Sequence, residues 1–181
     1  KPNLPKENAK IVVMSTNNKE LVKRVEELGV KVLSSENLSK LLTFEQYHTD
    51  LQFLHYNKDT VFVLKECTGL KENLKKYFSN VIEISKNVDK NYPNNVMLNC
   101  VVLNDKLICN TKTIADEVLQ MAIKDNLKII NVNQGYTKCS TCIVNENAII
   151  TSDKSIYNSC RNEMDVLLIR QGYIELPGTD Y

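Results

Sequence analysis

The feature of the sequence that most restricts the fold is a degenerate internal repeat. Three stretches of similar pattern begin at His48, Asn95 and Tyr136, and each ends in an asparagine that opens a short polar turn. An apolar run, a segment with helical spacing and another apolar run follow each turn. The expected unit is therefore strand, turn, strand, helix, strand. Units of this size must pack against their neighbours to bury their apolar faces.

The repeat predicts an α/β fold and divides a single domain, residues 1–181, into units. A partial unit over 9–46 precedes three fuller units at about 47–93, 94–134 and 135–177. The partial unit should hold a strand, a helix closed by Gly29 and a returning strand. In the fuller units we expect helices at 70–78, 113–125 and 153–164, and one more short strand at 173–176. A ring of such units would bring strand ends from different units to one centre.

Composition describes an ordinary globular protein and gives no reason to expect a polyanionic partner. Apolar residues make up 43% of the chain and charged residues 25%, with a net charge of +1. This balance predicts neither nucleic acid nor a membrane surface as partner. No export signal or membrane-length apolar run is visible, and the six cysteines lie in apolar, strand-like context. We therefore expect reduced thiols in a cytoplasmic protein.

The stretch from Gln134 to Thr151 is a candidate for chemistry. Cys139 follows Gly135 closely and lies on a predicted strand, a position that suits a nucleophilic thiol and equally a small buried side chain. Cys142 should face the opposite side of a regular strand and pack. The two cysteines have the spacing of a zinc or redox pair, but the sequence holds no second ligand pair at metal spacing, so no metal is expected.

A second group of polar residues opens the first of the three stretches. His48, Asp50 and Gln52 alternate, so on a strand they would share one face and could line a wall of a cleft. The alternative is a histidine on a solvated edge. Alignment of the turns sets Cys139 level with Leu51, so the repeat does not itself bring His48 and Cys139 together.

Two local matches give the chain a resemblance to the penteins, the α/β-propellers of guanidino-group-modifying enzymes. His48-Thr49-Asp50 looks like the family's His-x-Asp motif. Residues 137–143 look like the strand that bears the catalytic cysteine in dimethylarginine dimethylaminohydrolases, and this unit follows the histidine unit by two, as in those enzymes. Segments 134–140 and 165–181 also resemble an uncharacterised clostridial family of the superfamily.

The resemblance implies a hydrolase or transferase acting on a small guanidino or amidino compound, without cofactor or metal. Cys139 would attack the guanidinium carbon, His48 would move protons, and Asp50 would hold the cation. Gln52 and Asp180 are further candidates for substrate contact, and a homo-oligomer is left open. The alternative function is a non-catalytic propeller that serves as a docking module, as in translation-factor relatives of this fold.

The chain departs from the family pattern in two ways. It holds three full units and a part where the ring has five, and it continues beyond the cysteine unit, which comes last in the known hydrolases. A permuted order, in which residues 178–180 begin the next unit, would reconcile the second departure. The missing initial methionine and the final residues are those expected of a trimmed or incomplete chain, whose ring would stay open.

Overall fold

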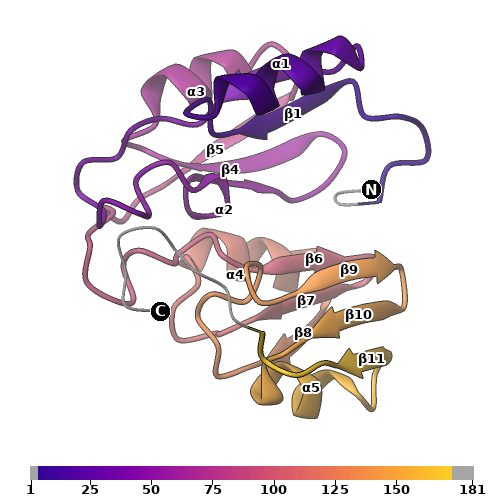
Figure 1. Ribbon diagram of the computed structural model, residues 1–181. Helices are drawn as coiled ribbons and strands as arrows, with labels where there is room; N and C mark the ends of the chain where they lie inside the picture. The colour runs from indigo at the N-terminus through magenta and orange to yellow at the C-terminus, as the bar shows by residue number, and fades with distance from the viewer. Residues whose placement is uncertain (1–3, 173–181) are drawn as a thin grey trace.

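The computed structural model describes residues 4–172 and confirms the repeated ββαβ unit (Figure 1). Unit 1 is partial and holds β1 (Ile11–Met14), α1 (Lys19–Glu27) and β2 (Lys31–Ser34). Unit 2 holds α2 (Thr49–Gln52), β3 (Phe53–His55), β4 (Thr60–Leu64), α3 (Thr68–Leu74) and β5 (Asn80–Ile84). Unit 3 holds β6 (Val101–Leu103), β7 (Lys106–Cys109), α4 (Asp116–Lys124) and β8 (Lys128–Asn131). Unit 4 holds β9 (Cys142–Asn145), β10 (Ala148–Thr151), α5 (Lys154–Cys160) and β11 (Asp165–Leu168).

Every full unit has the same sheet topology. Its first two strands form an antiparallel hairpin, and the strand after the helix pairs in parallel with the second. The sheet of unit 1 consists of β1 and β2 alone, paired in parallel. It therefore matches the last two strands of a full unit. Units 1 and 2 form the upper half of the view and units 3 and 4 the lower half, with α1 and α3 at one end and α5 at the other (Figure 1).

The sheet of unit 3 is buried on both faces and separates two hydrophobic cores. Val102 on β6 and Leu107 on β7 belong to a core shared with units 1 and 2. Their neighbours Leu103 and Ile108 point to the other side, into a core shared with unit 4. This alternation follows from the two-residue period of a strand, which sends successive side chains to opposite faces. Unit 3 is thus the common wall of the molecule.

The three hairpin turns use their asparagines in two different ways. Asn57 and Asn145 each accept a hydrogen bond from the backbone N–H two residues later, through Oδ1, at 3.0 and 2.7 Å. This closes an Asx turn. Asn104 instead has a φ of +53°, the left-handed region that asparagine tolerates better than other residues with a Cβ. One residue type therefore meets two backbone requirements.

The difference predicts opposite responses to substitution. Asn104→Ala should lower the free energy of unfolding by about 1 kcal/mol, whereas Asn104→Gly should change it by less than about 0.5 kcal/mol, because glycine adopts a positive φ without steric cost. Urea unfolding of both variants measures the difference. At Asn145, which lacks the positive φ, alanine should be no worse than glycine. Equal effects of alanine and glycine at Asn104 would contradict this reading.

The structure corrects the predicted lengths of the first strands and the bounds of the helices. The helices predicted at 70–78, 113–125 and 153–164 are Thr68–Leu74, Asp116–Lys124 and Lys154–Cys160. Only three or four residues near the end of each repeated stretch form the strand, and a turn or, in unit 2, the short helix α2 precedes it. Helix α4 begins at Asp116 rather than at residue 113, because the Thr113 hydroxyl donates to the Asn110 carbonyl instead of capping the helix. The predicted strand at 173–176 and the end of the last unit lie outside the described residues. Between residues 4 and 172, no helix has the length and apolar character needed to cross a membrane.

Candidate functional site

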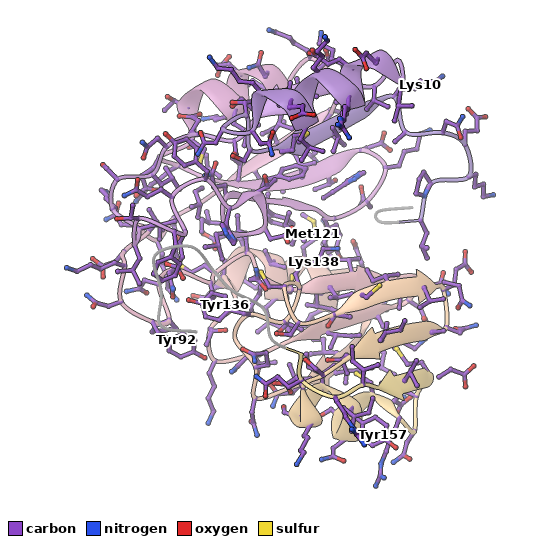
Figure 2. All side chains as sticks on the ribbon, viewed as in Figure 1. Lys10, Tyr92, Met121, Tyr136, Lys138 and Tyr157 are labelled. Carbon is purple, nitrogen blue, oxygen red and sulfur yellow. The ribbon has the colours of Figure 1, made fainter. Side chains whose placement is uncertain are left out.

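The turns that precede the first strands of units 2, 3 and 4 meet at Asn99. Its Oδ1 accepts hydrogen bonds from the backbone N–H groups of Lys138 and Cys139, at 2.7 and 3.3 Å. Its Nδ2 donates to the Cys139 sulfur at 3.1 Å and to the Asp50 carbonyl at 3.4 Å. A single buried amide, 1% exposed, thus holds Cys139 and Asp50 at one place in the fold. Figure 2 shows neighbouring Lys138 between the two halves of the molecule.

Cys139 lies in a tight turn and not on the predicted strand, which begins only at Cys142. The Ser140 N–H bonds the Tyr136 carbonyl at 3.0 Å, as in a helical turn. The Thr137 hydroxyl donates to the Gln134 carbonyl at 2.6 Å, and the Thr141 hydroxyl to the Thr137 carbonyl at 2.7 Å. These short side-chain bonds to backbone compete with sheet pairing and fix the turn.

A second polar cluster joins the same three turns. The buried Glu45 carboxylate, 4% exposed, accepts from the Tyr136 hydroxyl at 2.6 Å and from Asn95 Nδ2 at 3.2 Å. Asn95 Nδ2 also donates to the Tyr136 oxygen at 2.5 Å. Burial, followed by the Glu45 bond, raises the pKa of Tyr136 well above its usual range, so the phenol keeps its proton. The backbone three residues before Cys139 is therefore anchored to Glu45, in the turn that leads into unit 2.

The electrostatics of Cys139 favour the neutral thiol in the free protein. The residue is exposed as a whole, yet neighbouring atoms crowd its sulfur. Desolvation raises the pKa of Cys139, and the negative charge of Asp50 raises it further, while the Asn99 hydrogen bond and the Lys138 ammonium lower it. A ligand cation placed between Asp50 and the sulfur would favour the thiolate. Burial also raises the pKa of Cys67 and Cys109 to about 12 and of Cys160 to about 11.

Asn99→Asp should raise the pKa of Cys139 further. The substitution keeps the oxygen that accepts from two backbone N–H groups but replaces the donor to sulfur with a carboxylate oxygen, a like charge beside the thiolate. We expect a higher pKa of the Cys139 thiol and, because less thiolate is present, alkylation by iodoacetamide at fixed pH slower by about tenfold. The pH dependence of the alkylation rate, followed in a Cys142→Ser background, measures it. Asn104→Asp, in the exposed turn of the same unit, is the matched control; an unchanged Cys139 profile in Asn99→Asp would contradict the assignment.

His48 is exposed at the start of the Asp50 turn, and the predicted strand face is wrong. It is the N-cap of α2, with Asp50 in the first turn of that helix. Residues two apart diverge on a helical turn, so His48, Asp50 and Gln52 do not share a face. The His48 side chain has no hydrogen-bond partner among residues 4–172. It precedes Asp50 by two residues, and its backbone N–H bonds the Glu45 carbonyl at 2.9 Å.

Gln52 is fully buried and holds a loop. Its Nε2 donates to the carbonyls of Glu36 and Gln46 at 2.6 and 2.9 Å, and its Oε1 accepts from the Glu36 N–H at 2.8 Å. These bonds use its amide within the protein, so the structure gives it no free group for a substrate.

The structure describes one of the two remaining residues with a predicted role, Cys142, and leaves the other, Asp180, outside the described residues. Cys142 is exposed at the start of β9, where packing was expected, and all six cysteines are free. The described part of the chain holds no group of three or more His, Cys, Asp or Glu side chains arranged to bind a metal.

The sequence did not point to Asn99 or Glu45. Asn99 stands just before the strand of its unit, as Cys139 does, and this shared position is the only sequence signal that marks it. Glu45 precedes the repeated stretch and carries no signal. Both act through contacts between turns of different units.

Comparison with known protein families identifies the family to which the chain belongs. Residues 12–181 match the family described as a family of unknown function, DUF6873. The chain belongs to this family. No curated protein sequence matches the DUF6873 chain.

Solved structures give the fold of the DUF6873 chain. It is similar to DDAH from Pseudomonas aeruginosa, solved as a cysteine-to-serine mutant complexed with citrulline, with a TM-score of 0.54 at 9% identity. The match covers 89% of this chain and 76% of that one. Agmatine deiminase from C. jejuni matches with a TM-score of 0.45 at 11% identity, over 88% of this chain and 59% of that one. The likeness to DDAH gives the chain the fold of the pentein α/β-propellers, as the sequence resemblance implied.

Proposed function

We propose that this DUF6873 protein is a guanidino-group hydrolase or transferase with Cys139 as its nucleophile. The observation that carries the proposal is the Asn99 bridge, which holds the Cys139 sulfur beside the Asp50 turn. A thiol and a carboxylate at one site suit a planar cation that is also an electrophile. The carboxylate binds the N–H groups of the guanidinium, and the sulfur approaches its carbon.

The proposed reaction begins when the substrate cation enters between Asp50 and Cys139. Its positive charge offsets the Asp50 charge and the desolvation that keep the thiol protonated, so binding promotes release of the thiol proton to solvent and formation of the thiolate. Sulfur then bonds to the guanidinium carbon, and the bond from that carbon to the leaving nitrogen breaks. His48 gives that nitrogen a proton, which leaves a covalent S-amidino intermediate.

Water or an acceptor amine completes the reaction. His48 removes a proton from the incoming group, which bonds to the amidino carbon as the carbon–sulfur bond breaks. Water yields a urea-type product and an amine yields a new guanidine, with the Cys139 thiolate restored in either case. The chemistry needs a reduced thiol, so we infer a single domain working in the cytoplasm, in keeping with the six free cysteines.

Paired alkylating agents test the proposal. 2-Chloroacetamidine carries the amidinium cation, and 2-chloroacetamide is its neutral counterpart of similar shape. Each forms a thioether with loss of chloride and of the thiol proton. We expect Cys139 to prefer the cationic reagent by at least about tenfold relative to exposed Cys142, which serves as the internal control. Peptide mapping by mass spectrometry gives both ratios. Equal preference at the two cysteines would remove the hydrolase proposal and favour the non-catalytic docking module.

A further inference from the structure

A cavity of about 400 Å³ opens beside the candidate site, between the strand of unit 1 and the first turn and strand of unit 2. Val12 and Val13 of β1 line one side, and Phe53 of β3 lines another. Asp50 and Lys138 also line it, and Lys138 directly precedes Cys139. The volume lies within the range of about 300–1,000 Å³ that is typical of small-molecule sites. The cavity therefore adjoins the groups that the proposed reaction uses.

Three rings form an aromatic wall in this cavity. The His55 ring stacks against Phe53 at 6.5 Å between centroids and meets Phe78 edge-on at 5.1 Å. Burial lowers the pKa of His55, so the imidazole is neutral at physiological pH and brings no charge into the cavity. Aromatic rings and β-branched side chains together suit an apolar group, and aryl groups especially.

The charged groups of the cavity are few. Among the described residues that line it, Asp50 and Lys138 are the charged side chains. An α-amino-carboxylate tail would need complementary charges at the far end of its binding site, because burial of unpaired charges is costly. The wall formed by Val12, Val13 and the three rings offers none. The lining thus favours a ligand with one cationic end and an apolar remainder.

We propose that the cavity binds the substituent of the substrate, and that the substrate is an aryl- or alkyl-substituted guanidine rather than a guanidino amino acid. The guanidinium lies at Asp50, next to Cys139, and the apolar substituent lies against Phe53, His55 and Phe78. This inference rests on the proposed function for its reacting group. What the inference adds is the chemical class of the substituent on the guanidine.

Binding of a matched ligand panel to the unmodified protein tests the inference. Isothermal titration calorimetry compares benzylguanidine with methylguanidine, arginine, benzylamine and phenylacetate. We expect benzylguanidine to bind at least about tenfold more tightly than methylguanidine or arginine, because burial of the aryl group adds apolar contact. Benzylamine should bind more weakly, because it lacks the fork of donors that a carboxylate accepts. Tighter binding of arginine, or equal binding of phenylacetate through Lys138, would overturn the inference.

A pair of neighbouring substitutions locates the binding site. Ala9 is exposed and lines the cavity, so Ala9→Phe should fill its entrance and weaken benzylguanidine binding by at least about tenfold. Asn8 is also exposed but does not line the cavity, and Asn8→Phe should leave binding unchanged. Equal affinities of the two variants would place the ligand elsewhere and contradict the proposal.

The outcomes separate this inference from the proposed function. Benzylguanidine that binds in the cavity while Cys139 shows no preference for the cationic alkylating agent would refute the reaction and retain the cavity assignment. Selective capture of Cys139 by chloroacetamidine without any preference for benzylguanidine would refute the cavity assignment alone.

Discussion

Replacement of Cys139 by serine is expected to abolish covalent capture of 2-chloroacetamidine at this site and to reduce turnover of a guanidine substrate by a factor on the order of 10³ or more. A serine hydroxyl keeps its proton near neutral pH, and the site contains no described base bonded to residue 139 that would remove it. Intact-protein mass spectrometry measures capture, and release of amine measures turnover.

The control for Cys139 lies three residues further along the chain. Cys142 is exposed at the start of β9 and outside the Asn99 contacts, so Cys142→Ser should leave capture and turnover nearly unchanged. Full activity in Cys139→Ser, or a comparable loss in Cys142→Ser, would show that the nucleophile has been assigned to the wrong residue.

His48→Ala is expected to slow turnover by a factor of about 10² to 10⁴, the range typical for loss of a general acid and base. His48 is exposed at the start of the Asp50 turn, and its side chain makes no capping hydrogen bond to α2. Because His48 would act in both steps, formation and release of the S-amidino adduct on Cys139 should both slow, and mass spectrometry after rapid quenching measures the two rates. Added imidazole should restore part of the rate.

The other histidine provides a matched comparison. His55 is partly buried between two phenylalanines, so His55→Phe removes an imidazole but retains a ring in the aromatic wall. Its turnover should fall less than that of His48→Ala, because the variant keeps an aromatic ring against the substituent and loses no group that moves a proton. A larger loss in His55→Phe than in His48→Ala would transfer the proton-moving role to His55.

Sequence patterns could predict the units because the relevant signals are local. Strand periodicity, the asparagine turns and the helical spacing each lie within about ten residues, and they located β4, β7, β10 and their helices. The turn that carries Cys139 could not be predicted in this way. It spans too few residues to show a period, and the hydroxyls of Thr137 and Thr141 give the backbone an alternative to the sheet.

The candidate site was only partly predictable for a different reason. His48, Asp50 and Cys139 carry side chains whose chemistry is visible in a sequence, and they could be proposed individually. The role of Asn99 depends on the folded contact that joins it to residues of units 2 and 4. An asparagine alone gives no sign of such a contact. Gln52 is the opposite case: its polar side chain led to a predicted substrate contact, but in the structure its amide holds the loop at Glu36.

The double burial of the unit 3 sheet has a consequence for the motions of the candidate site. Asn99 belongs to the unit whose strands contribute to both cores, whereas Cys139 and His48 lie on turns of the flanking units. Opening unit 3 would expose both cores at once, so its amides should exchange with solvent only through global unfolding. The exposed start of α2 at His48 can open locally at lower cost. The site would thus have one fixed member, Asn99, against which the His48 end of α2 adjusts when a ligand enters.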